Sequence, residues 1–528
     1  AWHVRRAPGV YSLFASNYSC GPDSFTLHFF QYLMEGKPFA VIETDGHSGD
    51  AGTKTRVEAF LHCVREDLRA GGRRAPADEG RLTVPPRGMS EVVRSGERVL
   101  LPRMGPATDV IAAALRGGGV DAEALPEPTV ETLRIGRRHT SGKECLPMAL
   151  TLGSLLERLE RERGTQRRHV LFMPSAEGPC RFGVYKELHQ ISLDRLGWGD
   201  RVRIWAPPSR NYFEGVQPGL KAVLFAGIAA SDRIRDMLYE VRPGEARPGA
   251  AERIHERWMS DLVALVERAA AAPDLSAGRV LVEAATGSVW GIPALVGRAG
   301  AELAAARGAR ALPVVLVAGE IYVRNVPFAN GTIVDALARR GIRARVAGVS
   351  EYLQYSDWNA VQNGEHGLSD HLSSWVRRRI EAAIHAAAAA PMGWAGTPST
   401  PDLVGSAAPY LRGALEGEAV LTIGAPVHAW RHREIDAAVS VGPLECMPNK
   451  LAESQFHHVS EREGLLSLTL SLNGDPLDPE ILDAFAFEVH ARFRAGRRSE
   501  PGGETKGESW VDRLDVSLDS GETAGDLP

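Results

Sequence analysis

The sequence has no apolar run long enough to cross a membrane and no excess of basic residues. Its best apolar run, residues 221–230, is far shorter than the roughly 20 residues that a bilayer requires. Lys and Arg number 61 against 66 Asp and Glu, which gives a net charge of −5. Nucleic-acid-binding proteins normally present a basic face. The first residues carry no apolar segment after their arginines, unlike a secretory signal. We therefore expect neither a nucleic-acid partner nor a membrane partner.

Cysteine is scarce, and several familiar motifs are missing. Five cysteines in 528 residues are too few for a disulfide scaffold and predict a cytoplasmic protein with reduced thiols. The chain contains no G-x-G-x-x-G after a strand, no H-E-x-x-H, no C-x-x-C and no G-x-S-x-G. Gly136 and Gly142-Lys143 approach a phosphate loop, but five residues separate the glycines and Glu144 stands where Ser or Thr must hold magnesium. ATP hydrolysis by that route is therefore not expected.

Short β-rich apolar runs alternate with longer helical patterns along most of the chain. Strands are predicted at 10–14, 39–43, 98–101, 169–173 and 201–205, and again at 312–318, 343–346, 437–441 and 466–472. Such alternation indicates an α/β fold with parallel sheets covered on both faces. We predict two doubly wound α/β domains, at residues 1–215 and 307–494, joined by a helical bridge at 216–306. Residues 495–528, rich in Gly, Ser, Glu and Asp, are predicted to be a disordered acidic tail.

Four of the five cysteines have a proline within two positions, namely Cys20, Cys145, Cys180 and Cys446. Each falls at a predicted junction into a helix, where free N–H groups and the helix dipole favour a thiolate. Thiolates at the carboxyl ends of parallel strands can converge on one ligand, and soft sulfur suits an iron–sulfur cluster or zinc. The alternative is that these cysteines are small buried hydrophobic residues. That alternative is favoured for Cys63, which lies within an amphipathic helical pattern.

A polar segment at residues 43–52 follows a predicted strand and precedes a helix. Asp45, His47 and Asp50 are candidate acid–base groups or cofactor contacts there. The alternative is that Asp and Gly in this segment only build a turn and cap the next helix.

Two further segments carry ionisable groups near predicted helix starts. Thr140, Ser141 and Lys143 precede Cys145 and form a candidate anion-binding corner, or else a capped helix with solvated cations. Glu320 and Arg324 follow a predicted strand at its carboxyl end, where they either bind a ligand or pair with each other. Glu320 is a candidate catalytic residue and Arg324 a candidate cofactor contact.

Four stretches containing these cysteines resemble a known family. Residues 17–25, 140–147, 178–183 and 442–448 are similar to CoA-activase-related proteins, homologues of the subunits of 2-hydroxyacyl-CoA dehydratase and benzoyl-CoA reductase. Residues 319–330 resemble the second half of those subunits, and the similarity extends over roughly 10–490. This resemblance implies two flavodoxin-like domains with a [4Fe–4S] cluster between them, held by cysteines at the positions of Cys20, Cys145, Cys180 and Cys446.

In the dehydratases, such a subunit receives an electron from an ATP-dependent iron–sulfur activator and passes it to an acyl-CoA thioester. The resemblance therefore implies a dehydratase-like component, either a radical acyl-CoA dehydratase or reductase component or its electron-transfer partner. The activator is expected as a separate protein or as domains upstream of this segment. A cluster with four cysteine ligands suits electron relay better than substrate activation. The competing hypothesis is a non-redox binding or scaffold module whose thiols are structural or bind zinc.

Overall fold

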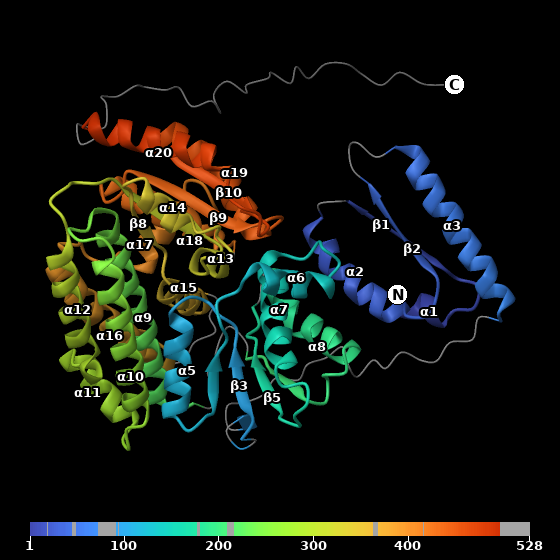
Figure 1. Cartoon of the computed structure of the whole chain (residues 1–528), viewed down its shortest axis with the longest axis horizontal. Helices are drawn as coiled ribbons and strands as arrows, with labels where there is room; N and C mark the ends of the chain where they lie inside the picture. Colours follow the sequence, from blue (N-terminus) through green and yellow to red (C-terminus); the bar gives the residue numbers. More distant parts are fainter. Residues whose placement is uncertain are drawn as a thin grey trace, which may run out of the picture.

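The computed structural model describes residues 1–17, 20–44, 49–71, 91–92, 94, 96–176, 180–207, 216–362, 368–415 and 417–496. It is an α/β protein whose strands pair in parallel (Figure 1). Within the described part of the chain, the strands form one sheet of two strands and two sheets of four. The predicted tail lies outside the described residues from 497 onward. No single described helix is both long and apolar enough to span a bilayer, although the bent pair 277–286 and 289–306 passes by length and composition alone.

The first four-stranded sheet has the order β4-β3-β5-β6. Its strands are β3 (Arg98–Leu101), β4 (Ala122–Ala124), β5 (His169–Phe172) and β6 (Val202–Trp205). Both faces are buried, because Val99 and Leu101 join one apolar core while Leu100 joins another. The covering helices are α5 (Ala107–Gly117) and α9 (Pro218–Val241) on one face, and α7 (Leu146–Glu160) and α8 (Tyr185–Arg195) on the other, with α6 (Val130–Arg138) against α7.

The second four-stranded sheet has the order β10-β9-β7-β8. Its strands are β7 (Val314–Gly319), β8 (Arg343–Val346), β9 (Ala437–Pro443) and β10 (Ser467–Leu472). When the strands of each sheet are numbered in chain order, and the sheets are read from β4 and from β8, both have the order second, first, third, fourth. Val315 and Val317 face a core formed with α14 (Ile333–Arg339) and α20 (Pro479–Arg494). Val314 and Leu316 face a core formed with α17 (Thr400–Ala407), α18 (Ala419–Arg431) and α19 (Met447–Glu463).

A helical layer lies beside the two sheets (green in Figure 1). The predicted helical bridge contains α9, α10 (Ala250–Ala270) and α12 (Ile292–Ala306), which coincide with helical patterns of the sequence, and α11 (Ala277–Thr286), which the sequence did not predict. A later helix, α16 (Leu368–Met392), packs against α9 and α12 and so belongs to this layer despite its place in the sequence. Two shorter helices lie closer to the second sheet, namely α13 (Ile321–Asn325) and α15 (Val349–Gln362).

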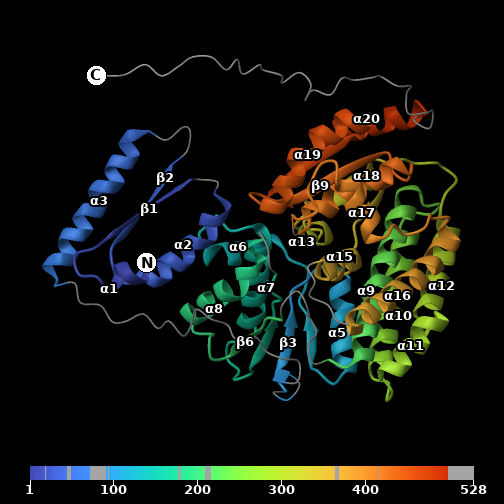
Figure 2. The ribbon, with the colours of Figure 1, turned by 180° about the vertical axis from the view of Figure 1, so that it is seen from behind.

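The N-terminal segment forms its own unit, which stands apart from the remainder in Figures 1 and 2. Here β1 (Ser12–Asn17) pairs with β2 (Phe39–Thr44) and with no other described strand. The unit also contains α1 (Trp2–Arg6), α2 (Gly21–Met34) and α3 (Asp50–Arg69). Its contacts with the first sheet's layer include those of α2, which packs against α8 and against the 3-10 turn η2 (Arg181–Val184). This contact brings the start of α2 to the site described next.

Candidate cysteine-lined site

Each of the four proline-flanked cysteines is the residue immediately before a helix. Cys20 precedes α2, Cys145 precedes α7, Cys180 precedes η2 and Cys446 precedes α19, all with extended backbone angles. The predicted junctions are therefore confirmed. The prolines of Cys20, Cys145 and Cys446 lie in the first helical turn, where a missing N–H removes no hydrogen bond. Proline in this position fixes the direction in which each helix leaves the cysteine.

Three of these cysteines line one cavity between the two four-stranded sheets. Cys145, Cys180 and Cys446 surround a space of about 210 Å³. The same cavity is lined by residues that follow the central strands of both sheets, including Met104 after β3 and Glu320 after β7. In sheets with this strand order, ligands bind where the order reverses, at the carboxyl ends of the strands. The cavity occupies that place in both sheets at once.

The two sheets supply equivalent positions to this cavity. Cys180 follows the third strand of the first sheet, β5, and Cys446 follows the third strand of the second sheet, β9. Cys145 caps α7, the helix that leads into β5, and Glu418 caps α18, the helix that leads into β9. Each half of the cavity thus has one side chain before its third strand and one after it. Cys180 and Cys446 occupy the position after the strand, whereas the position before it holds the thiol of Cys145 in one half and the carboxyl of Glu418 in the other.

Cys20 lies beside this cavity rather than among its lining residues. Arg181 joins the two regions: its guanidinium donates to the Gly21 carbonyl (3.1 Å), to Ser24 Oγ (2.6 Å) and to the Glu445 carbonyl (2.6 Å). A Cβ atom at Gly21 would lie 3.5 Å from the same Glu445 oxygen, so the starts of α2 and α19 touch. The structure therefore brings the backbone flanking Cys20 against the backbone flanking Cys446.

Burial dominates the electrostatics of the three lining thiols. It raises the pKa of Cys180 to about 12, and the pKa values of Cys145 and Cys446 also lie above the ordinary value. At these three helix starts desolvation outweighs the N–H groups, contrary to the sequence-based expectation that such positions favour the thiolate. The backbone N–H groups of Met148, Phe182 and Asn449 nevertheless lower the pKa values of Cys145, Cys180 and Cys446, respectively.

Tyr185 is a buried polar partner of these thiols that sequence reasoning missed. Its hydroxyl lies 2.5 Å from Cys145 Sγ, and its ring stacks on Phe25 with centroids 5.8 Å apart. Burial raises the pKa of Tyr185 well above its ordinary value, so the phenol stays protonated and can donate to the sulfur. A tyrosine at the start of a helix after a cysteine corner gives no sequence pattern that would have identified it.

Glu320 and Arg324 meet at this site but are mostly engaged with the protein itself. The Glu320 carboxylate accepts from the N–H groups of Tyr322 and Val323, and so caps α13, while its side chain also lines the cavity. Arg324 is buried and donates to the carbonyls of Gly319, Ala347 and Gly348 and to Glu418 Oε1 (3.2 Å). The ion-pair partner of Arg324 is therefore Glu418, which the sequence did not single out. Burial raises the pKa of Glu418 to about 8 and also raises that of Glu320.

The predicted anion-binding corner is organised around a side chain of the protein. The N–H groups of Ser141 and Gly142 and the Ser141 hydroxyl donate to the carboxylate of Glu144, which also contacts His28. Lys143 pairs with Glu43. Thr140 donates to the Arg137 carbonyl at the end of α6. The donors that an incoming anion would use are thus bonded to Glu144, one residue before Cys145.

The remaining predicted residues lie away from the cavity or outside the description. Asp50 is exposed in the first turn of α3. Cys63, further along the same helix, is exposed too, so the expectation of a buried hydrophobic residue there is wrong: among the residues of α3 that the structure describes, only Asp67 is buried. Asp45 and His47 lie outside the described residues.

Three thiols of the cavity are the candidate ligands for a bound group, and thiolates are the ligands that iron–sulfur clusters take in proteins. Among the described residues, no three His, Cys, Asp or Glu side chains lie close enough together to hold one metal ion. No protein-family model matches the chain, and no curated protein shows significant similarity to it.

Proposed function

We propose that this chain is an iron–sulfur protein whose [4Fe–4S] cluster is held between its two four-stranded sheets. The observation that carries the proposal is the meeting of Cys145, Cys180 and Cys446 in one buried cavity although they come from distant parts of the sequence. Three isolated buried cysteines would have no reason to share a cavity. Cys20, whose flanking backbone touches that of Cys446, is the proposed fourth ligand.

The chain's own groups suit this role. Cys145, Cys180 and Cys446 would hold the group as thiolates, losing the protons that burial otherwise keeps on them. The N–H groups at the helix starts and the Tyr185 hydroxyl would then donate to sulfur, and such hydrogen bonds tune the potential of a cluster. When bound, the cluster supplies one-electron transfer. Cys145 and Cys446 are buried and Cys180 is partly buried, which limits the access of water to the sulfurs.

The finer assignment follows from the family resemblance together with the strand order. The order of both four-stranded sheets agrees with the start of a flavodoxin-like sheet, which supports two flavodoxin-like domains. We propose a 2-hydroxyacyl-CoA dehydratase-like component in the cytoplasm that accepts electrons from an ATP-dependent iron–sulfur activator. The apolar lining of the cavity, with Met104, Ile111 and Phe172, offers space beside the thiols for an acyl group.

Anaerobic reconstitution tests the cluster. We expect a brown protein with about four irons and four sulfides per chain. Replacing Cys145, Cys180 or Cys446 by Ser should each lower the iron content severely, whereas Cys63→Ser, at an exposed cysteine of α3, should leave it unchanged. Loss of iron in Cys20→Ser would establish a closed four-cysteine cluster, and retention would leave one iron open.

A colourless, iron-free protein after reconstitution would refute the proposal. A colourless protein containing zinc would replace it with the scaffold hypothesis, because zinc gives neither visible absorption nor a paramagnetic signal. Dehydratase activity is tested separately, by turnover of a 2-hydroxyacyl-CoA with added activator, ATP and reductant.

A further inference from the structure

A second cavity, of about 140 Å³, lies between the helical layer and the second sheet. Its walls come from α9, from the end of β8, from α15, α16 and α18, and from the loop that joins α16 to α17. It shares no lining residue with the cysteine-lined cavity. Helix α15 separates the two, because Glu351 lines this cavity while Tyr352 and Leu353 line the other. Neither the sequence motifs nor the proposed function involves this second cavity.

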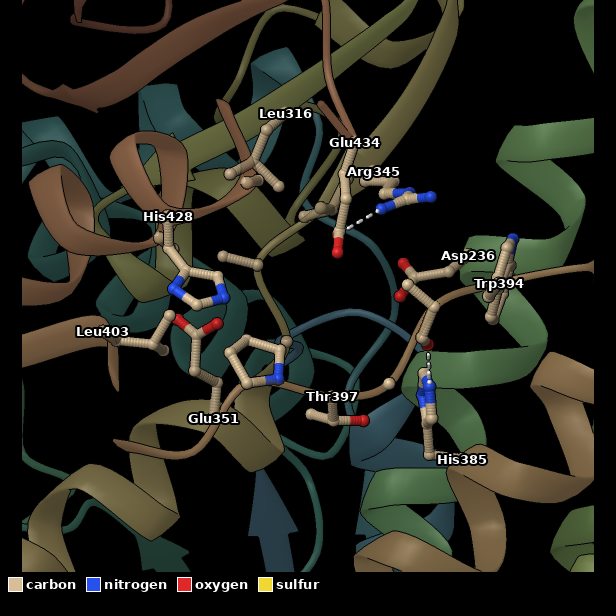
Figure 3. Close-up of a pocket in the computed structure, with 18 of the residues that line it drawn as sticks. Asp236, Leu316, Arg345, Glu351, His385, Trp394, Thr397, Leu403, His428 and Glu434 are labelled. Atoms are coloured by element: carbon tan, nitrogen blue, oxygen red, sulfur yellow. Dashed lines mark hydrogen bonds and ion pairs between the residues drawn. The ribbon is translucent and has the colours of Figure 1, made fainter. Parts of the chain in front are cut away.

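Three carboxyl groups and two guanidinium groups line this cavity, together with the imidazoles of His385 and His428. The carboxyl groups of Asp236, Glu351 and Glu434 point into the same space from three sides (Figure 3). Two guanidinium groups also line it, and both have carboxylate partners. Arg345 pairs with Glu434 at 3.1 Å, and Arg233 pairs with Glu381 at 3.0 Å and with Asp236 at 3.4 Å. Glu351 is the lining carboxylate that no guanidinium pairs with at ion-pair distance among the described residues.

Glu351 also lacks a hydrogen-bond partner. Its Oε1 is buried and accepts no hydrogen bond from the described residues. His385 is similar: its Nε2 donates to the Ala395 carbonyl at 2.6 Å, which leaves Nδ1 as a buried acceptor without a donor. Buried acceptors are normally satisfied, so two of them on one cavity call for an N–H or O–H donor inside it. Two donors, Arg233 Nε and Trp394 Nε1, are unpartnered as well. Burial without an ion-pair partner raises the pKa of Glu351, and a bound cation would supply the missing partner and hold its carboxylate ionised.

The other walls are apolar and set the size. Leu316, Leu403 and Pro398 face the space together with the Trp394 ring, which stacks on His385. An apolar cavity of roughly this volume accommodates benzene, a molecule of about six non-hydrogen atoms. Part of the loop that forms one wall, Ala395 to Thr397, is exposed, so a ligand can reach the cavity from solvent.

We propose that this cavity binds a small organic cation, an alkyl amine or amidinium of about six non-hydrogen atoms whose charged N–H group donates to Glu351. The aliphatic part of the ligand lies against Leu316, Leu403 and Trp394. An anion is disfavoured because both arginines at the cavity are already paired with carboxylates.

Calorimetric titration of the full chain with matched four-carbon probes tests this proposal. The probes are n-butylamine, 1-butanol and butanoate, which share an alkyl chain and differ in charge. We expect butylamine to bind at least about tenfold more tightly than butanol, since its hydrogen bonds are charge-assisted, and butanoate not to bind. Equal affinity for amine and alcohol, or preferential binding of butanoate, would overturn the proposal.

Glu351→Gln removes the charge while keeping the shape, and it should fold because the Oε1 it alters has no partner to lose. Its affinity for butylamine should fall about tenfold, to near that for butanol, with an unchanged thermal midpoint. Glu58→Gln, at an exposed glutamate of α3, is the matched control and should bind like the wild type. Should Glu351→Gln unfold, Thr397→Tyr provides a second variant, which narrows the cavity from its exposed loop and should weaken amine binding. Undiminished butylamine binding in a folded variant would contradict the assignment.

Discussion

The Arg181 side chain ties the N-terminal unit to elements of both four-stranded sheets, so its replacement by Met should loosen the site. Arg181→Met keeps an apolar stem but removes donors from three acceptors. The Gly21 carbonyl retains the Ser24 hydroxyl as a donor at 2.6 Å, whereas the Glu445 carbonyl loses its guanidinium donor. One lost charged hydrogen bond to Ser24 and one acceptor deprived of its donor together predict a destabilisation of about 3 kcal/mol.

Denaturant unfolding measures this loss, and hydrogen exchange shows where it falls. We expect amide protection to drop at the starts of α2 and α19 more than within the central strands β5 and β7. Arg195→Met is the control, because Arg195 is an exposed arginine whose contact is the Tyr32 ring, and it should cost no more than about 0.5 kcal/mol. A loss below about 1 kcal/mol for Arg181→Met, or uniform loss of protection, would refute the idea that one guanidinium joins the two helix starts.

Two further predictions concern stability. Burial lowers the pKa of His189 to about 4, so the folded protein keeps this ring neutral while the unfolded chain protonates near its ordinary pKa. The free energy of unfolding should therefore be highest above pH 6.5 and fall by about 3 kcal/mol as the pH drops to 4. Denaturant unfolding of His189→Gln should show a weaker dependence on acid pH. A Cβ at Gly136 would overlap the Ala149 carbonyl oxygen where α6 crosses α7, so Gly136→Ala should destabilise by about 3 kcal/mol. Gly52→Ala, on α3 with open space around it, should instead stabilise by about 0.7 kcal/mol in the same assay; equal effects of the two substitutions would contradict the crossing geometry.

Much of the fold could be predicted from local pattern. The strand predicted at 98–101 coincides with β3, and those at 169–173 and 201–205 differ from β5 and β6 by one residue, because buried parallel strands are continuous apolar runs. Strand β4 was not predicted, since three residues with a central Glu123 present no such run. Helix α2 was predicted only as a helix start after Cys20, without bounds, and the proline after Cys20 lies in its first turn.

The candidate site was only partly predictable, for a different reason. Cysteine, proline and helix start are local features, and their coincidence at Cys145, Cys180 and Cys446 could be found in the sequence. Which loops then face one another depends on how the two sheets pack, and no pattern within one loop contains that information. Glu418 and Arg181 are ordinary residues in the sequence that gain their importance from neighbours hundreds of positions away.

The equivalent positions of Cys180 and Cys446, and of Cys145 and Glu418, have a consequence for the origin of the cavity. The two halves of the chain share one strand order and each places residues at equivalent positions of the cavity. In this respect they resemble the two subunits of a homodimer, although they belong to one polypeptide. This is the arrangement that duplication of an ancestral gene would produce, with an originally isologous interface becoming the ligand pocket. Within one polypeptide the two halves can differ, and a thiol at one capping position opposite a carboxyl at the other is an asymmetry that two identical subunits could not carry.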